Sequence, residues 1–274
     1  MQGFSVNRDA CTRCGQCVLA CGRQALTDDG AGGPNLPEAN LVFCNACGHC
    51  SAICPVGAIV SPKCNGEKAA PYPNAQKLSG AEAERFLLSC RSMRRYKEEA
   101  VPKNEILELL EIVRKSPTAS NSQPVSWAVI SDRKMARQFT ALTMEWFDTV
   151  VRNDPNRNSL YNIDNMMARY RGGYDTILRG APNAVLAMTD KNWGWGAADA
   201  AIAMTYFCLV AHSRDIGSCW CGLGMLALRE YKPLRDLLEL DDNLAVHAMA
   251  FFGYPNISYH SVPPRKSLRV KWVQ

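Results

Sequence analysis

Cysteine is the residue type whose spacing in this 274-residue sequence most directly indicates chemistry. Eight of the 13 cysteines form two runs with the same spacing, C-x2-C-x2-C-x3-C, which are Cys11, Cys14, Cys17 and Cys21, then Cys44, Cys47, Cys50 and Cys54. Gaps of two residues allow three thiolates of one tight loop to reach three corners of a cubic iron–sulfur cluster, while a fourth ligand comes from a distant segment. The two runs therefore predict electron transfer at iron.

The two runs resemble those of bacterial-type ferredoxins that carry two 4Fe-4S clusters. In that family, three cysteines of each run bind one cluster and the fourth binds the other. The usual proline follows the second run as Pro55, whereas Gly22 takes its place in the first run. The resemblance implies that one cluster is held by Cys11, Cys14, Cys17 and Cys54, and the other by Cys44, Cys47, Cys50 and Cys21.

Structural zinc and disulfides are the two alternative uses of so many cysteines. A zinc ribbon needs two thiolates from each of two knuckles, which leaves the third cysteine of each run unexplained. Disulfides need an oxidising compartment, and the opening Met1-Gln2-Gly3-Phe4 lacks the charged and apolar segments of a secretory leader. We therefore expect a cytoplasmic protein with iron–sulfur clusters.

Composition and charge limit the classes of molecule that this protein is expected to bind. Hydrophobic residues make up 47% and charged residues 21%, as in ordinary globular proteins, and the longest apolar stretch, residues 197–211, is too short to span a membrane. Much of the net charge of +5 lies in two short clusters, Arg91 to Arg95 and Arg265 to Lys271. Without a long basic face with interleaved aromatic residues, these clusters favour a bound phosphate over a nucleic acid.

The length predicts two domains and an α+β fold. We expect a ferredoxin-type domain over residues 1–62, a proline-containing linker over 63–78 and a larger domain over 79–274. A capping box at Ser79 and Glu82 predicts a first helix, and an apolar stripe of Ile106, Leu107, Leu110 and Val113 predicts a second, ended by Pro117. Further helices are expected at 133–150 and 197–212, and strands at 125–130, 182–188 and 245–252.

Four separated segments of the larger domain resemble the FMN-dependent nitroreductase family, and the whole chain resembles its ferredoxin-fused branch. Each segment alone is a weak signal, but all four occur in the family's order. They are Arg91-Ser92-x-Arg94-x-Tyr96, Ser116 to Pro124, Gly217 to Gly222, and Gly253-Tyr254-Pro255 followed by Arg265-Lys266.

The resemblance implies that Arg91, Ser92 and Arg94 hold the phosphate and ribityl chain of FMN. Arg265 and Lys266 would close over the same phosphate, since guanidinium groups form strong charge-assisted bonds with phosphate. Family members commonly begin the first segment with two arginines, and Cys90 stands at the first of these positions here.

The loop over residues 117–124 resembles the family loop that reaches the flavin of a partner subunit. The positions carried over are Pro117, Thr118, Ala119, Asn121 and Gln123. Because flavin sites of this family lie at a subunit interface, the resemblance implies a symmetric homodimer. The tail over residues 254–274 is then expected to wrap around the partner.

Cys221 and Gly222 occupy the family segment whose backbone faces the isoalloxazine ring near N5. We interpret the Cys221 thiol as a small buried apolar group rather than a nucleophile or a redox partner of Cys219. His49 is interpreted as a donor to cluster sulfur and not as an iron ligand. No side chain is assigned a catalytic role, and the roles of Cys64 and Cys90 are left open.

The sequence thus favours an oxidoreductase in which low-potential electrons, from reduced ferredoxin or a similar donor, pass through two clusters to FMN. The acceptor would be a nitroaromatic, a quinone or an activated alkene. Two alternatives stay open. One is a non-enzymatic electron-transfer or redox-sensing protein, and the other is an NAD(P)H-driven nitroreductase in which the clusters are an outlet for electrons.

Overall fold

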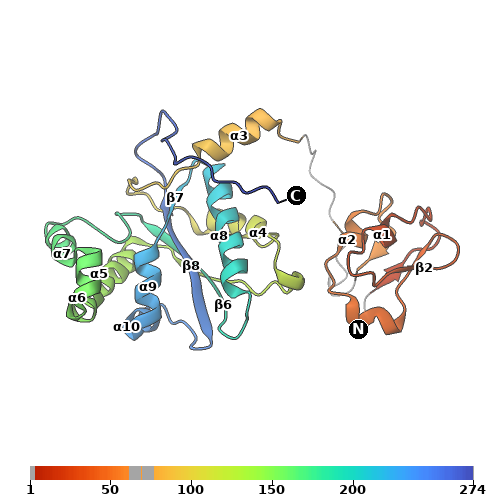
Figure 1. The fold of residues 1–274 in the computed structure, drawn as a ribbon, viewed down its shortest axis with the longest axis horizontal. Helices are drawn as coiled ribbons and strands as arrows, with labels where there is room; N and C mark the ends of the chain where they lie inside the picture. Colours follow the sequence, from red (N-terminus) through yellow and green to blue (C-terminus); the bar gives the residue numbers. More distant parts are fainter. Residues whose placement is uncertain (1–3, 62–68, 70–76, 274) are drawn as a thin grey trace. The chain divides into compact units, whose positions relative to one another are not determined.

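The computed structural model describes residues 4–61, 69 and 77–273 (Figure 1). The chain divides into two units, the first formed by Met1–Lys77 with Thr118–Gln123, and the second by Leu78–Pro117 with Pro124–Gln274. Most of the segment predicted as a linker, residues 63–78, lies outside the described residues. Among the described residues, no helix combines the length and the apolarity needed to cross a membrane.

The first unit is built from very short elements. β1 (Ser5–Val6) pairs antiparallel with β4 (Ile59–Val60), and β2 (Thr27–Asp28) pairs antiparallel with β3 (Pro34–Asn35). Its helices are α1 (Gln16–Leu19), the 3-10 helix η1 (Glu38–Phe43) and α2 (His49–Ala52). The buried apolar cluster is small, with Cys17, Leu26 and Ile59 at its centre. A core of this size needs additional cross-links to be stable, and bound clusters would supply them.

The two cysteine runs share a backbone conformation as well as a spacing. Arg13 (φ 55°) and Ala46 (φ 53°) are left-handed at the same position of their runs. Gly15 (φ 70°) and Gly48 (φ 76°) are left-handed two residues later, where they precede α1 and α2. Non-glycine residues in this conformation are uncommon and cluster at functional sites. The duplication therefore extends from the cysteines to the loops that carry them.

The second unit is organised around one antiparallel sheet. Its strands are β5 (Ser126–Ile130), β6 (Asn183–Asp190), β7 (Gly217–Trp220) and β8 (Leu244–Gly253), in the order β5-β6-β8-β7. The two central strands, β6 and β8, pair over almost their whole length, with a register shift between Ala187 and Met188. The strands predicted from the apolar runs are β5, β6 and β8, whereas the four-residue edge strand β7 was not predicted.

Helices cover both faces of this sheet (Figure 1). On one face, α4 (Lys103–Val113) and α8 (Gly196–His212) pack against alternate residues of the central strands, such as Val185 and Ala250. The intervening residues, such as Leu186 and Phe251, face the opposite cluster, to which α5 (Arg133–Thr149), α7 (Ile163–Arg171), α9 (Gly222–Glu230) and α10 (Lys232–Leu237) contribute. A short helix, α6 (Pro155–Tyr161), contacts α7. This alternation gives a three-layer α+β unit.

Two helix predictions have different outcomes. The capping box is confirmed at α3 (Gly80–Ser89), where Ser79 N donates to Glu82 Oε2 (2.8 Å) and Glu82 N donates to Ser79 Oγ (3.3 Å). The predicted apolar stripe of α4 was partly wrong. It omitted Leu109, which is fully buried, and included Leu107, which is 64% exposed. Buried positions 106, 109 and 113 follow the helical repeat, which a run of several leucines conceals.

Candidate functional site

The structure arranges the eight cysteines of the two runs around two cavities. Beside one cavity lie Cys11, Cys14, Cys17 and Cys54, and beside the other lie Cys44, Cys47, Cys50 and Cys21. Each cavity therefore takes three thiols from one run and the last thiol from the other, which is the crossed arrangement that the ferredoxin resemblance implies. The ligand assignment itself stays a prediction. His49 lines the second cavity, in keeping with its interpretation as a neighbour of the cluster.

Burial disfavours the thiolate form of two of these cysteines. Burial raises the pKa of Cys50 to about 11 and also raises that of Cys17. Because iron binds the thiolate, cluster binding would supply the positive charge that these buried sulfur atoms need.

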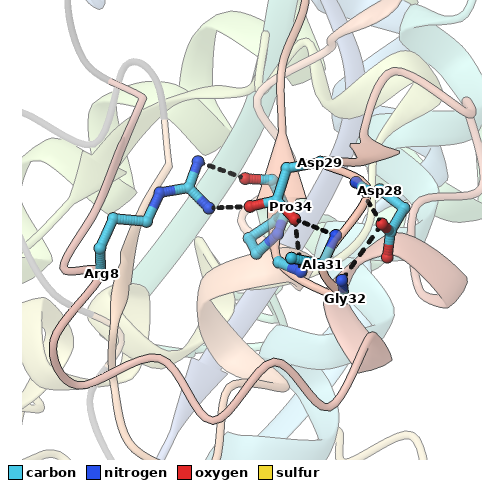
Figure 2. A network of polar contacts seen from close by, with 8 residues as sticks. Arg8, Asp28, Asp29, Ala31, Gly32 and Pro34 are labelled. Atoms are coloured by element: carbon cyan, nitrogen blue, oxygen red, sulfur yellow. Dashed lines mark hydrogen bonds and ion pairs between the residues drawn. The ribbon is translucent and has the colours of Figure 1, made fainter.

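A small loop borders the first cavity, and Figure 2 shows the polar contacts that hold this loop. Asp28 Oδ1 accepts N–H groups of Gly30 (2.6 Å) and Gly32 (3.2 Å), and Asp29 Oδ1 accepts those of Ala31 (3.0 Å) and Gly33 (2.9 Å). The two carboxylates thus fix the turn between β2 and β3. Gly32 and Pro34 of this turn line the cavity of the first cluster.

Arg8 attaches this turn to the strand end that precedes the first cysteine run. Its guanidinium donates to Asp29 Oδ2 (2.6 Å) and to the carbonyl of Pro34 (3.0 Å), as Figure 2 shows. Backbone N–H groups of Ala31 and Gly33 are the main cause of the lowered pKa of Asp29, with a contribution from Arg8. The carboxylate therefore stays ionised, and its bonds to the turn persist, until the pH falls below its ordinary pKa and reaches the lowered one.

In the second unit, three of the four nitroreductase-like segments meet at the edge strand β7. Ser92 forms a parallel bridge with Ser218 of β7, and Met93 N donates to the Ser218 carbonyl (2.9 Å). Tyr96 forms an antiparallel bridge with Pro255, and Lys97 N donates to the Tyr254 carbonyl (2.8 Å). Segments more than 120 residues apart in the chain are therefore held together by backbone pairing.

Gly217 permits this close pairing. A Cβ atom at position 217 would lie 2.7 Å from the Cβ and Cγ atoms of Met93. Any larger residue would push the segment that carries Arg91 and Arg94 away from β7.

Arg91 is the strongest candidate for a phosphate ligand. It lines a cavity of about 440 Å³ together with Cys90, Ser218 and residues 257–262 of the tail. Its Nε atom is buried and has no hydrogen-bond partner among the described residues. A buried guanidinium nitrogen without a partner is costly, and a phosphate oxygen would satisfy it. The site therefore fits the FMN phosphate, although Cys90 offers no charge where the family commonly has a second arginine.

The other predicted phosphate ligands are not gathered at this cavity. Arg94 and Ser92 are exposed, and Arg94 Nη1 donates to the Ser92 carbonyl (3.3 Å) within their own loop. Arg265 and Lys266 lie on an exposed tail and make no hydrogen bond or ion pair within the described part of the chain. Their assignment stays a prediction from the resemblance alone.

Cys221 and Gly222 begin α9. The N–H of Cys221 donates to the Met249 carbonyl (2.8 Å), and the N–H of Gly222 is the first of the helix itself. The N–H of Gly224, two residues later, interacts with the Cys221 thiol. Gly222 is exposed, and a Cβ atom there would meet nothing within 4 Å. Burial raises the pKa of the Cys221 thiol to about 12. A thiol of this kind stays protonated at neutral pH, which supports the apolar role predicted for it.

The loop over residues 117–124 is largely grouped with the first unit. There Asn121 Nδ2 donates to the carbonyls of Asn45 (3.4 Å) and Ala46 (3.1 Å), beside the second cysteine run. The N–H of Gln123 donates to Thr118 Oγ1 (3.0 Å), which closes the loop on itself. The predicted approach of Pro117, Ala119 and their neighbours to the flavin of a partner stays a prediction.

Sequence reasoning missed two features of this unit. One is the backbone pairing of Ser218 with the segment that carries Ser92 and Met93, because the strand of Ser218 is too short to give a periodic signal. The other is a group of arginines on Tyr174, for which the excess of basic over acidic residues in 169–180 was the available signal.

Comparison with known protein families agrees with this geometry. Residues 87–254 match the nitroreductase family, and residues 10–58 match the 4Fe-4S dicluster domain, which implies two clusters. An Archaeoglobus fulgidus protein named "Putative NADH dehydrogenase/NAD(P)H nitroreductase" is 26% identical over 176 residues, or 64% of this chain and 86% of that protein. Iodotyrosine deiodinase of Thermotoga neapolitana is 20% identical over 166 residues, or 61% of this chain and 84% of that protein.

Two solved structures show the same fold as the second unit. One is a nitroreductase with bound FMN from Bacteroides fragilis, with a TM-score of 0.55 and 18% identity over 70% of this chain and 99% of that one. The other is a nitroreductase with bound FMN from Desulfitobacterium hafniense, with a TM-score of 0.56 and 18% identity over 70% of this chain and 97% of that one. The predicted α+β architecture is confirmed, whereas the dimer stays a prediction.

We expect Gly32→Ala to impair the first cluster and Gly30→Ala to spare it. Both glycines are left-handed (φ 82° and 85°), but only a Cβ atom at position 32 would meet a backbone atom, the Arg13 carbonyl oxygen at 2.7 Å. The measurement is iron and acid-labile sulfide per chain after anaerobic purification, with Gly32→Ala expected to fall toward one cluster. Equal iron contents in the two variants would show that the close approach to Arg13 is irrelevant.

We expect Arg91→Gln to weaken FMN binding by roughly tenfold to a hundredfold, since a bond to a charged group contributes about 1.5–3 kcal/mol. The measurement is the Kd from quenching of FMN fluorescence on titration into flavin-free protein. Lys97→Gln is the matched control, because it removes the same charge from an exposed position six residues away. An unchanged Kd in Arg91→Gln would contradict the phosphate assignment.

Proposed function

This chain belongs to the nitroreductase family, and from that membership we propose that it is an FMN-dependent oxidoreductase which passes electrons from two 4Fe-4S clusters to FMN and on to a small acceptor. The observation that carries the proposal is the meeting of three family segments at β7, beside the unpartnered Nε of Arg91. The same chain holds the two four-thiol cavities. A nitroaromatic, a quinone or an activated alkene is the acceptor class.

When bound, FMN would collect electrons singly from the clusters and deliver them as a pair. The chain's own residues bind and orient the groups. Arg91 would hold the phosphate, and the start of α9 at Gly222 would present backbone N–H groups to the ring. Because the Cys221 thiol stays protonated and buried, it offers no nucleophile to the acceptor. The proposal therefore assigns no catalytic role to Cys221.

The protein would act as a symmetric homodimer. The tail after β8 exposes large apolar side chains, with Leu268, Trp272 and Val273 each at least 85% exposed. Apolar side chains along an extended segment are stabilised when a partner surface covers them. Sedimentation equilibrium that gave the 30.3 kDa mass of one chain would contradict this part of the proposal.

The electron donor is proposed to be reduced ferredoxin or another low-potential carrier. NAD(P)H is the second candidate donor, because the Archaeoglobus fulgidus relative carries that nucleotide in its name. The two donors predict different orders of reduction. A one-electron carrier would reduce the clusters first, whereas a hydride donor would reduce the flavin first.

Anaerobic stopped-flow absorbance distinguishes these orders. Reduced ferredoxin, NADH and NADPH would each be mixed with the protein, and cluster and flavin absorbance followed together. We expect reduced ferredoxin to bleach the clusters before FMN, and Cys14→Ala to slow FMN reduction by this donor, because Cys14 lies beside the first cavity. Direct reduction of FMN by dithionite in Cys14→Ala is the control for an intact flavin site. Rapid FMN reduction by NAD(P)H with lagging clusters would contradict the proposed direction of electron flow.

A further inference from the structure

Three guanidinium groups surround one aromatic ring in the second unit. The Cζ atoms of Arg169, Arg95 and Arg179 lie 4.5, 5.1 and 5.6 Å from the centroid of the Tyr174 ring. Each distance is within the range of a cation–π contact. We call these four residues the Tyr174 arginine cluster.

The phenolic oxygen of Tyr174 forms hydrogen bonds with two of these guanidinium groups. It accepts a hydrogen bond from Arg95 Nη1 (2.9 Å) and another from Arg179 Nη1 (3.3 Å). Burial raises the pKa of Tyr174, but the bonds and charges of Arg179 and Arg95 outweigh it and leave the pKa lowered. Because the phenolic oxygen accepts both bonds, its own proton is directed to an acceptor other than these arginines.

The positive charge of the Tyr174 arginine cluster is not neutralised within the described part of the chain. Arg95, Arg169 and Arg179 form no ion pair with a carboxylate there, whereas nearby Arg152 pairs with both Asp148 (2.8 Å) and Asp164 (2.6 Å). Three like charges around one ring repel one another, and an anion between them would remove that repulsion. The arrangement thus has the charge and the donors of an oxyanion site.

A rigid turn holds Arg179 in place. Asp175 Oδ1 accepts the N–H groups of Ile177 and Leu178 (both 2.9 Å), and its Oδ2 accepts that of Gly180 (3.0 Å). Arg179 is left-handed within this turn, with φ 59°. A strained backbone conformation persists only where its surroundings impose it. The turn therefore fixes the direction in which the Arg179 side chain projects from the backbone.

Arg169 and Arg179 also line a cavity of about 210 Å³. Thr176 contributes a hydroxyl-bearing side chain to its wall, and Leu223 contributes an apolar one. Leu223 directly follows Gly222 at the start of α9, the segment to which the family resemblance assigns the flavin ring. A group bound by the two arginines would therefore lie beside the segment where electrons leave the protein.

We propose that the Tyr174 arginine cluster binds a carboxylate, or an oxyanion of similar size, on the acceptor, so that the substrates of this protein are anionic. The inference rests on the proposed function for the identity of the ligand as an acceptor. Arg169 and Arg179 bind the anion directly. Tyr174 positions both guanidinium groups, and Arg95 holds the phenol through its own hydrogen bond to the phenolic oxygen.

Binding without turnover is the first test. Isothermal titration calorimetry on the oxidised holoprotein compares 4-nitrobenzoate with 4-nitrobenzamide, which has nearly the same shape but no charge. We expect the benzoate to bind about tenfold more tightly, because each guanidinium bond to a carboxylate is charge-assisted. Arg169→Gln and Arg179→Gln are each expected to remove that preference. Equal affinity for the two compounds in the unmodified protein would overturn the proposal.

Arg171→Gln is the matched control. It removes the same charge from the same helix as Arg169, but Arg171 faces Asp148 at 3.8 Å and does not line the cavity. We expect it to keep the preference for the benzoate. The same loss of preference in Arg171→Gln would show that the overall positive charge of this surface, and not the proposed site, causes the preference for the benzoate. The proposed site would then be wrong.

Two further readouts separate this proposal from the proposed function. FMN retained per chain should be unchanged in Arg169→Gln and Arg179→Gln, and loss of FMN from both would assign the arginines to the cofactor and overturn the inference. In turnover, both variants should raise the KM for 4-nitrobenzoate by a larger factor than the KM for 4-nitrobenzamide. A preference in binding without reduction of either compound would sustain the anion site and contradict a nitroaromatic as the acceptor in the proposed function.

Discussion

Each of the two cysteine-lined cavities takes thiols from two different loops, and this sharing organises the first unit. Each cavity takes its last cysteine, Cys54 or Cys21, from the run that serves the other cavity. Neither half of the unit can therefore complete a site alone. The apolar core around Leu26 and Ile59 is small, so the clusters would act as the principal cross-links of this fold. The stability of this unit and the proposed electron transfer would thus depend on the same eight thiols.

The second unit depends on a different constraint, the pairing of chain segments at a sheet edge. β7 is only four residues long, yet it aligns the Arg91 segment through Ser218, while the end of β8 aligns Tyr96 and Lys97. An edge strand has unpaired backbone groups, and here the segment that follows Arg91 forms hydrogen bonds with them. The helices on both faces keep the sheet rigid beneath this edge. The proposed flavin phosphate site is therefore built mainly from backbone geometry, to which one buried arginine adds charge.

The sequence predicted most of this arrangement for identifiable physical reasons. The cysteine spacing has few alternative uses, and the long apolar runs of β6 and β8 are distinctive because both faces of these strands are buried. Prediction from the sequence failed where an element was too short to give a periodic pattern or where a site depended on tertiary contacts. β7 is too short to show a period, and the buried face of α4 could not be read from its several leucines. The Tyr174 arginine cluster joins residues of three separate segments, which no local pattern records.

The proposed flow of electrons from the clusters to FMN can be tested by a spectroelectrochemical titration of the holoprotein. Cluster and flavin absorbance would be recorded together against applied potential. We expect both cluster potentials to lie below, or close to, the two-electron potential of FMN, so that transfer to the flavin is downhill. An FMN potential well below those of both clusters would contradict it, because electrons would then flow from the flavin to the clusters.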